Sequence, residues 1–162
     1  MSFFKKKMDA QVIDLKPIRV VMIRHTGPYD QLDRLFEQLW KWIGAKNVPA
    51  QRTIGIYWDN PDFTAPSALR SAACVEVPED FQLADKGGLP LEISEIYGGT
   101  YVTLRYVGPY DDLASVWQDL TKSIEKNLKR TISERPAFEV YVNDASETEP
   151  KDLITELYMP IL

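Results

Sequence analysis

Apolar residues recur at helical spacing in two stretches of the chain, each following the same four-residue turn sequence, Gly-Pro-Tyr-Asp. The apolar positions are Leu32, Leu35, Phe36, Leu39 and Ile43 in the first stretch, and Leu113, Val116, Trp117, Leu120 and Ile124 in the second. Spacings of three and four residues place these side chains on one side of a helix. The pattern therefore predicts one long amphipathic helix in each half of the chain.

The remaining apolar segments are short and bounded by Pro, Gly, Asp and Asn, which is typical of strands separated by turns. The predicted strands are residues 11–15, 19–25, 54–58, 71–77, 92–97, 101–106, 137–142 and 155–161. Residues 79–90, which contain Gly87 and Gly88, are predicted to be a linker.

Two blocks of sequence occur twice, in the same order. Arg24–Leu32 resembles Arg105–Leu113, so that Gly27 corresponds to Gly108. Ile56–Asn60 resembles Val140–Asp144, so that Tyr57 corresponds to Tyr141. The chain is therefore interpreted as two copies of one unit.

The proposed units are residues 9–78 and 91–162, preceded by an N-terminal tail of residues 1–8. The predicted fold is α+β, with duplicated ββαββ units, antiparallel sheets and one long helix in each unit. Residues 9–162 would form one domain, in which the units are related by a pseudo-twofold axis around a central ligand cleft.

Alternate residues of a strand point to opposite faces of its sheet. If apolar alternate residues such as Phe138, Val140, Ile54 and Ile56 cover the helix of their own unit, their neighbours face away from it. The residues predicted on these far faces, and hence predicted to line the cleft, are Val20, Met22, Tyr57, Cys74, Tyr101, Thr103, Tyr141, Glu156 and Tyr158. An apolar, aromatic surface with a few polar groups is typical of a small-molecule site.

Glu156 is the carboxylate of this set, and its repeat equivalent is Ala72. It could be the counter-ion of a cationic ligand, with tyrosine rings offering cation–π contacts. It could also be a general base with a raised pKa. The structural alternative is a strand-end carboxylate that reaches water or a nearby arginine.

Charge and composition exclude several classes of protein. With 19 basic and 24 acidic residues the net charge is −5, so the chain lacks the basic surface of a nucleic-acid binder. One cysteine and one histidine leave no cysteine-based zinc site or disulfide framework, and no metal or other cofactor is expected. The absence of a membrane-spanning or signal-like apolar run predicts a cytoplasmic protein.

Four sequence blocks resemble the DNA gyrase inhibitory protein family. They are Ile56–Asp62 followed by Leu69-Arg70, Glu95–Val102, Phe138–Asn143 and Thr155–Met159. The broader group is the GyrI-like small-molecule-binding domain, which also forms the effector-binding half of AraC-type activators and MerR-type multidrug sensors.

The resemblance implies a duplicated βαββ core around a cleft for lipophilic, often cationic, ligands. Glu156 occupies the motif position of the glutamate that, in the drug sensors, is the counter-ion of the cationic ligand. The gyrase-inhibitor branch lowers gyrase activity and protects cells from gyrase-directed toxins, so DNA gyrase is a candidate partner. Other relatives hydrolyse cyclopropane-bearing toxins with a cleft glutamate.

The favoured interpretation is a stand-alone, GyrI-like, multidrug-binding protein of stress response and toxin resistance, with a cleft centred on Glu156. The alternative is a hydrolase of strained electrophilic toxins in which Glu156 is catalytic and activates water. A third is an interaction module that acts on gyrase without using its cleft.

Overall fold

A computed structural model describes residues 9–162 as two compact units. The first unit is residues 16–98, and the second unit is residues 99–162 together with the N-terminal strand. The tail predicted for residues 1–8 lies outside the described residues. No helix of the described chain combines the length and apolar character needed to cross a membrane.

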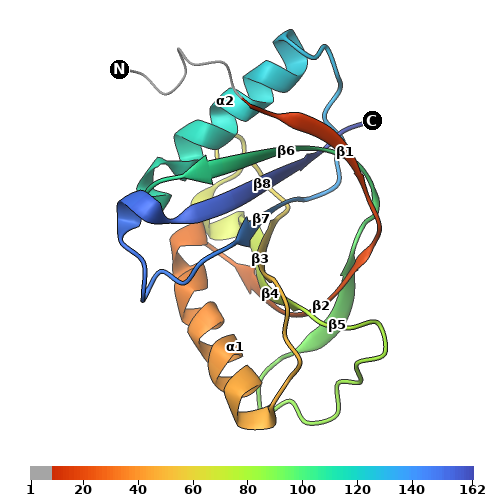
Figure 1. Ribbon diagram of the computed structural model, residues 1–162, viewed down its shortest axis with the longest axis vertical. Helices are drawn as coiled ribbons and strands as arrows, with labels where there is room; N and C mark the ends of the chain where they lie inside the picture. The colour runs from red at the N-terminus through yellow and green to blue at the C-terminus, as the bar shows by residue number, and fades with distance from the viewer. Residues whose placement is uncertain (1–8) are drawn as a thin grey trace. The chain divides into compact units, whose positions relative to one another are not determined.

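Each unit contains a four-stranded antiparallel sheet, one α-helix and two 3₁₀ turns (Figure 1). The elements of the first unit are β2 (Ile18–Thr26), η2 (Tyr29–Gln31), α1 (Leu32–Lys46), β3 (Thr53–Tyr57), η3 (Pro66–Ala68), β4 (Arg70–Glu76) and β5 (Glu92–Ile96). Those of the second unit are β1 (Gln11–Leu15), β6 (Gly99–Val107), η4 (Tyr110–Asp112), α2 (Leu113–Lys126), β7 (Ala137–Tyr141), η5 (Pro150–Asp152) and β8 (Ile154–Pro160). The predicted α+β class, both helices and the eight strands are confirmed, and the strand ends differ only slightly from those predicted.

The two units have the same strand order. The order is β5-β2-β4-β3 in the first unit and β1-β6-β8-β7 in the second. The short edge strands β5 and β1 therefore occupy equivalent places in their sheets. Each unit is a βαββ core with one added edge strand.

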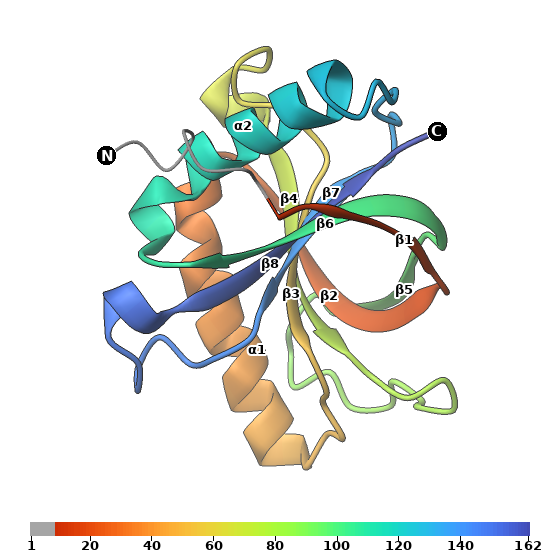
Figure 2. The ribbon, with the colours of Figure 1, turned by 45° about the horizontal axis from the view of Figure 1, so that its top comes forward.

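The edge strands are exchanged with respect to the sequence repeat. β1 precedes the first repeat core but pairs with β6 of the second, and β5 precedes the second core but pairs with β2 (Figure 2). This pairing differs from the contiguous ββαββ units that the sequence predicts. A tight two-residue hairpin needs positive φ at its first central residue, which in the Lys16-Pro17 connection is Lys16, and Lys16 is not among the described residues with positive φ. The chain therefore continues past the connection to a different partner.

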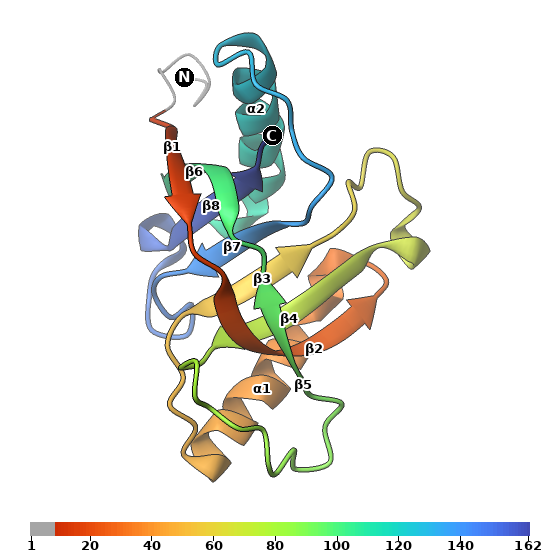
Figure 3. The ribbon, with the colours of Figure 1, turned by 90° about the vertical axis from the view of Figure 1, so that its right-hand side faces the viewer.

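In the second unit α2 packs on one face of the sheet, here called the helix face. The core beneath α2 contains Val102, Leu104 and Tyr106 of β6 and Leu157 of β8, together with the helix residues Leu113, Val116, Leu120 and Ile124. In the first unit α1 lies behind β3 and β4 in Figure 3 and buries Leu32, Phe36, Leu39 and Trp42. Trp42, outside the predicted apolar stripe, donates a 2.7 Å hydrogen bond to the Asp85 carbonyl of the linker. This bond fastens the linker to α1.

Candidate functional site

The strand register assigns every predicted site residue to a face, because directly paired residues point to the same side of a sheet. In the second unit Glu139 pairs with Leu157, and Tyr141 pairs with Thr155. Leu157 belongs to the core under α2, so Glu139 and Tyr141 lie on the helix face. The prediction that Tyr141 faces away from its helix is wrong.

The same correction applies to Tyr57 in the first unit. Tyr57 pairs with Ser71, and its ring meets the ring of Tyr29, just before α1, at 4.9 Å between centroids. Tyr141 makes the equivalent contact with Tyr110, just before α2, at 5.8 Å. Both tyrosines therefore pack at the start of their own helix, so the far face of each unit does not contain them.

The error has a physical cause in the burial of both faces of β7 and β3. Phe138 and Val140 are 1% and 2% exposed although they lie on the far face, and Glu139 is only 5% exposed on the helix face. Ile54 and Ile56 of β3 are likewise buried on the far face. When both faces of a strand are buried, polar alternation no longer tells which face meets the helix.

Three aromatic rings pack together on the far face of the second unit. Phe138 and Tyr158 are stacked, with centroids 4.5 Å apart and planes inclined by 6°. Tyr101 meets Phe138 edge-on at 5.5 Å and Tyr158 at 6.5 Å. We call Tyr101, Phe138 and Tyr158 the aromatic trio. Burial raises the pKa of Tyr101.

Glu156 lies beside the trio and has two hydrogen-bonding partners. Arg105, directly opposite on β6, places Nη2 2.8 Å from Oε2 of Glu156. The phenol of Tyr158 donates to Oε1 at 3.2 Å. The Glu156 side chain is 22% exposed and that of Arg105 is 59% exposed, so the ion pair lies at the edge of the buried rings. The structure therefore shows the contact with a nearby arginine that the sequence analysis gave as the structural alternative for Glu156.

Thr103 completes the predicted set in the second unit. It pairs with Tyr158 across β6 and β8 and is partly buried. Of the residues predicted in this unit, the structure brings together Tyr101, Thr103, Tyr158 and Glu156. It adds Phe138 and Arg105, which the sequence prediction left out.

The far face of the first unit is aliphatic. Val20, Met22 and Cys74, all predicted there, are at most 1% exposed, and Met22 pairs with Cys74. Burial raises the pKa of the Cys74 thiol well above its usual range, so this sulfur is an apolar packing group and no thiolate. The centre of this face is therefore apolar and, among the described residues, carries no charged side chain.

Glu139 is a buried carboxylate that the sequence analysis overlooked. Its Oε2 accepts a 2.5 Å hydrogen bond from the indole of Trp117, and its Oε1 accepts a 2.7 Å bond from the phenol of Tyr141. The sequence repeat could have identified Glu139, because the equivalent residue of the first unit is Gly55 and the carboxylate is therefore not required by the repeat. The same reasoning applies to Glu156, whose equivalent is Ala72.

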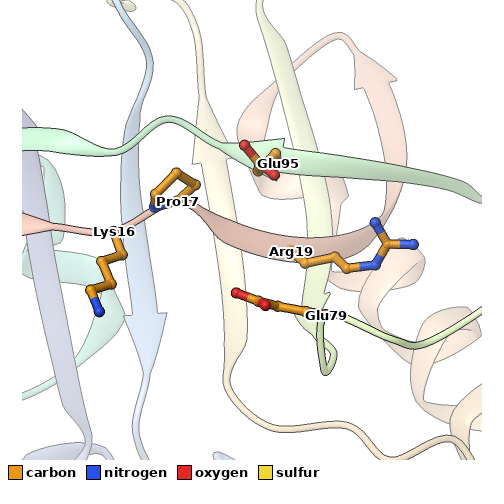
Figure 4. Close-up of a pocket in the computed structure, with 5 residues that line it drawn as sticks. All are labelled: Lys16, Pro17, Arg19, Glu79 and Glu95. Atoms are coloured by element: carbon orange, nitrogen blue, oxygen red, sulfur yellow. The ribbon is translucent and has the colours of Figure 1, made fainter.

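A separate surface pocket of about 330 Å³ lies in the first unit, between β2, β5 and the start of the linker (Figure 4). Its lining residues are Lys16, Pro17, Arg19, Glu79 and Glu95. The guanidinium of Arg19 is anchored by a 2.9 Å bond from Nη2 to the Phe81 carbonyl. The lining contains two cations and two carboxylates and none of the predicted site residues. Within residues 9–162, no group of three or more His, Cys, Asp and Glu side chains is arranged to hold a metal ion.

The fold places the chain in the class of α+β domains with antiparallel sheets and two helices. The chain belongs to the family of the GyrI-like small molecule binding domain, which matches residues 8–162. A DNA gyrase inhibitor of Citrobacter rodentium is 34% identical over 137 residues, covering 83% of this chain and 85% of that protein. A DNA gyrase inhibitor of Escherichia coli strain K12 is 33% identical over 138 residues, with the same coverage.

Solved structures share the fold at low sequence identity. The EcmrR C-terminal domain superposes with a TM-score of 0.75 at 18% identity, covering 96% of this chain and 98% of that domain. SAV2435 bound to tetraphenylphosphonium superposes with a TM-score of 0.64 at 13% identity, covering 96% and 94% of the two chains. These likenesses establish the fold.

Proposed function

We propose that this protein binds lipophilic, often cationic, small molecules at the far face of the second unit, beside the aromatic trio. The observation that carries the proposal is the position of Glu156, whose partly exposed carboxylate accepts a hydrogen bond from the phenol of Tyr158. The residues of the trio are at most 7% exposed, so a ligand has to open this edge to reach their rings, and there it meets the carboxylate of Glu156 with its partner Arg105. Membership of a small-molecule-binding family and the tetraphenylphosphonium bound by SAV2435 support this choice of ligand class.

Binding is preferred to hydrolysis because the chain belongs to a small-molecule-binding family. Arg105 and Tyr158 each donate to one of the carboxylate oxygens of Glu156 and hold it in place. Each oxygen keeps a second acceptor site, so these two donors do not exclude a water beside the carboxylate. The hydrolase is therefore the alternative that the turnover measurement below tests.

The test is the affinity of the purified protein for tetraphenylphosphonium, measured by isothermal titration calorimetry for the wild type and for Glu156→Gln. Loss of the charge should weaken binding by about 1–3 kcal/mol, the scale for a charged hydrogen-bonding partner. Glu92→Gln is the matched control, because Glu92 is likewise paired with an arginine, Arg24, but belongs to the first unit. Equal affinities for the wild type and Glu156→Gln would place the ligand elsewhere. Turnover of a strained electrophile that Glu156→Gln abolishes would instead support the hydrolase.

We further propose that the protein inhibits DNA gyrase, as the names of its relatives indicate for those proteins. Gyrase supercoiling of a relaxed plasmid should slow when the protein is added. A net charge of −5 over 162 residues is too small for us to attribute inhibition to mimicry of DNA. Unchanged supercoiling at a large molar excess of the protein would remove gyrase as a partner and leave the ligand-binding proposal unaffected.

A further inference from the structure

Arg105 occupies the position next to Glu156 that a cationic group of a ligand would take. Its Nη2 lies 2.8 Å from Oε2 of Glu156, and the two residues are directly opposite each other on β6 and β8. A second positive charge at this carboxylate would either repel Arg105 or displace it. Arg105 is therefore placed to influence which ligands the site accepts.

The exposures of the two side chains favour displacement. The Arg105 side chain is 59% exposed, whereas that of Glu156 is 22% exposed and is also held by the phenol of Tyr158. An ion pair with one largely exposed partner contributes little stability, so the arginine can move into water at small cost. The carboxylate stays in place through its hydrogen bond from the phenol of Tyr158.

The repeat supplies an internal comparison. The equivalent of Arg105 in the first unit is Arg24, and the equivalent of Glu156 is Ala72. Arg24 has its own carboxylate, Glu92 on β5, and its guanidinium lies 5.3 Å from the centre of the Trp58 ring. Each unit thus has an arginine at this position, but only Arg105 pairs with the candidate ligand-binding carboxylate.

We infer that Arg105 is a specificity-determining residue which competes with cationic ligands for Glu156, so that the site accepts neutral and anionic ligands as well as cationic ones. This inference rests on the proposed ligand site. With Arg105 in place, the edge of the trio presents one positive and one negative group and discriminates weakly by charge. Without it, the site presents a carboxylate and should prefer cations.

Tetraphenylphosphonium and tetraphenylborate test this inference, because the two ions have nearly the same shape and opposite charges. Affinities for both are measured by calorimetry on the wild type, Arg105→Met and Arg24→Met. Both substitutions change the net charge equally, so Arg24→Met controls for the overall field. Arg105→Met should bind the phosphonium about two- to fivefold more tightly than Arg24→Met does, the range for removing an exposed competing ion pair. It should bind the borate more weakly.

Three other outcomes separate the two proposals. If Arg105→Met binds both ions as the wild type does while Glu156→Gln loses the phosphonium, the role of Arg105 is wrong and the ligand site stands. If neither the wild type nor Arg105→Met binds either ion, the ligand site is wrong and the inference falls with it. If Arg105→Met does not fold, Arg105→Gln replaces it, since the amide removes the charge and keeps a hydrogen-bond donor; unchanged charge preference in that variant overturns the inference.

Discussion

The indole of Trp117 on α2 donates a 2.5 Å hydrogen bond to the carboxylate of Glu139 on β7, which is 5% exposed. A buried carboxylate is costly unless its oxygens accept hydrogen bonds, and here the phenol of Tyr141 supplies a second donor. The contact therefore joins the helix to the sheet of the second unit through a polar network, where the first unit has Phe36 and Gly55 at the equivalent positions.

The first prediction concerns this network. Trp117→Phe removes the indole donor and keeps an aromatic ring, so it should lower the free energy of unfolding by about 1–3 kcal/mol, the cost of leaving a buried acceptor without its partner. Urea denaturation measures the change. Trp40→Phe is the control, because Trp40 lies on α1 with 47% of its surface exposed and should give a much smaller change. Equal losses for the two variants would contradict the assigned role of the Trp117 indole.

The second prediction concerns acid stability and compares Asp59 with its repeat equivalent, Asn143. Oδ2 of Asp59 accepts the backbone N–H of Arg70 at 2.8 Å, as Oδ1 of Asn143 accepts that of Ile154 at 2.9 Å. Hydrogen bonds from the Arg70 guanidinium lower the pKa of Asp59 below its ordinary value of 3.8. An amide at position 59 should therefore keep the turn and lose only the ion pair.

Because the folded pKa of Asp59 is depressed, its ionic contribution is present above the ordinary pKa and is lost as the pH falls through the folded pKa. Asp59→Asn should be less stable than the wild type at pH 7, and the difference should shrink as the pH falls below about 4. Chemical denaturation at several pH values measures it. A difference for Asp59→Asn that stays constant down to about pH 2 would contradict the ion-pair explanation.

The third prediction concerns the thiol of Cys74, which is 0% exposed on β4. Since it is the single cysteine of the chain, labelling reports on this site alone. Ellman's reagent should react with the native protein only as fast as the protein opens, and should react at once in denaturant. Immediate labelling of the native protein would show that the far face of the first unit is accessible to solvent.

The fourth prediction concerns Gly108, which has a φ of +152° at the turn before α2. A Cβ there would lie 2.5 Å from Oη of Tyr106, whose hydroxyl donates to the Pro109 carbonyl. Gly108→Ala should lower the unfolding free energy by about 1–3 kcal/mol through backbone strain and displacement of this ring. Gly88→Ala adds a Cβ at a φ of +80° with no atom within 4 Å, so it measures strain without the clash. Thermal denaturation that shows Gly88→Ala to be the more damaging change would refute the role of the Tyr106 contact.

The amino-acid sequence alone determined the local elements and the repeat. The stripe from Leu32 to Leu39 and its counterpart from Leu113 to Leu120 predicted both helices, because their periodicity follows from local backbone geometry. The correspondence between Gly27 and Gly108 likewise identified equivalent turns, which the structure shows as matching positive φ angles of +136° and +152°. Such features depend on residues close together in the chain.

Only the tertiary structure decided which strands pair and which faces are covered. The pairing of β1 with β6 joins residues far apart in the chain, such as Gln11 and Thr103, and nothing in β1 itself specifies that partner. The helix-face position of Tyr57 and Tyr141 depends on Tyr29 and Tyr110, which lie at the start of each helix. Apolar alternation marks two distinct faces, but when both faces are buried only the surrounding packing determines which of them meets the helix.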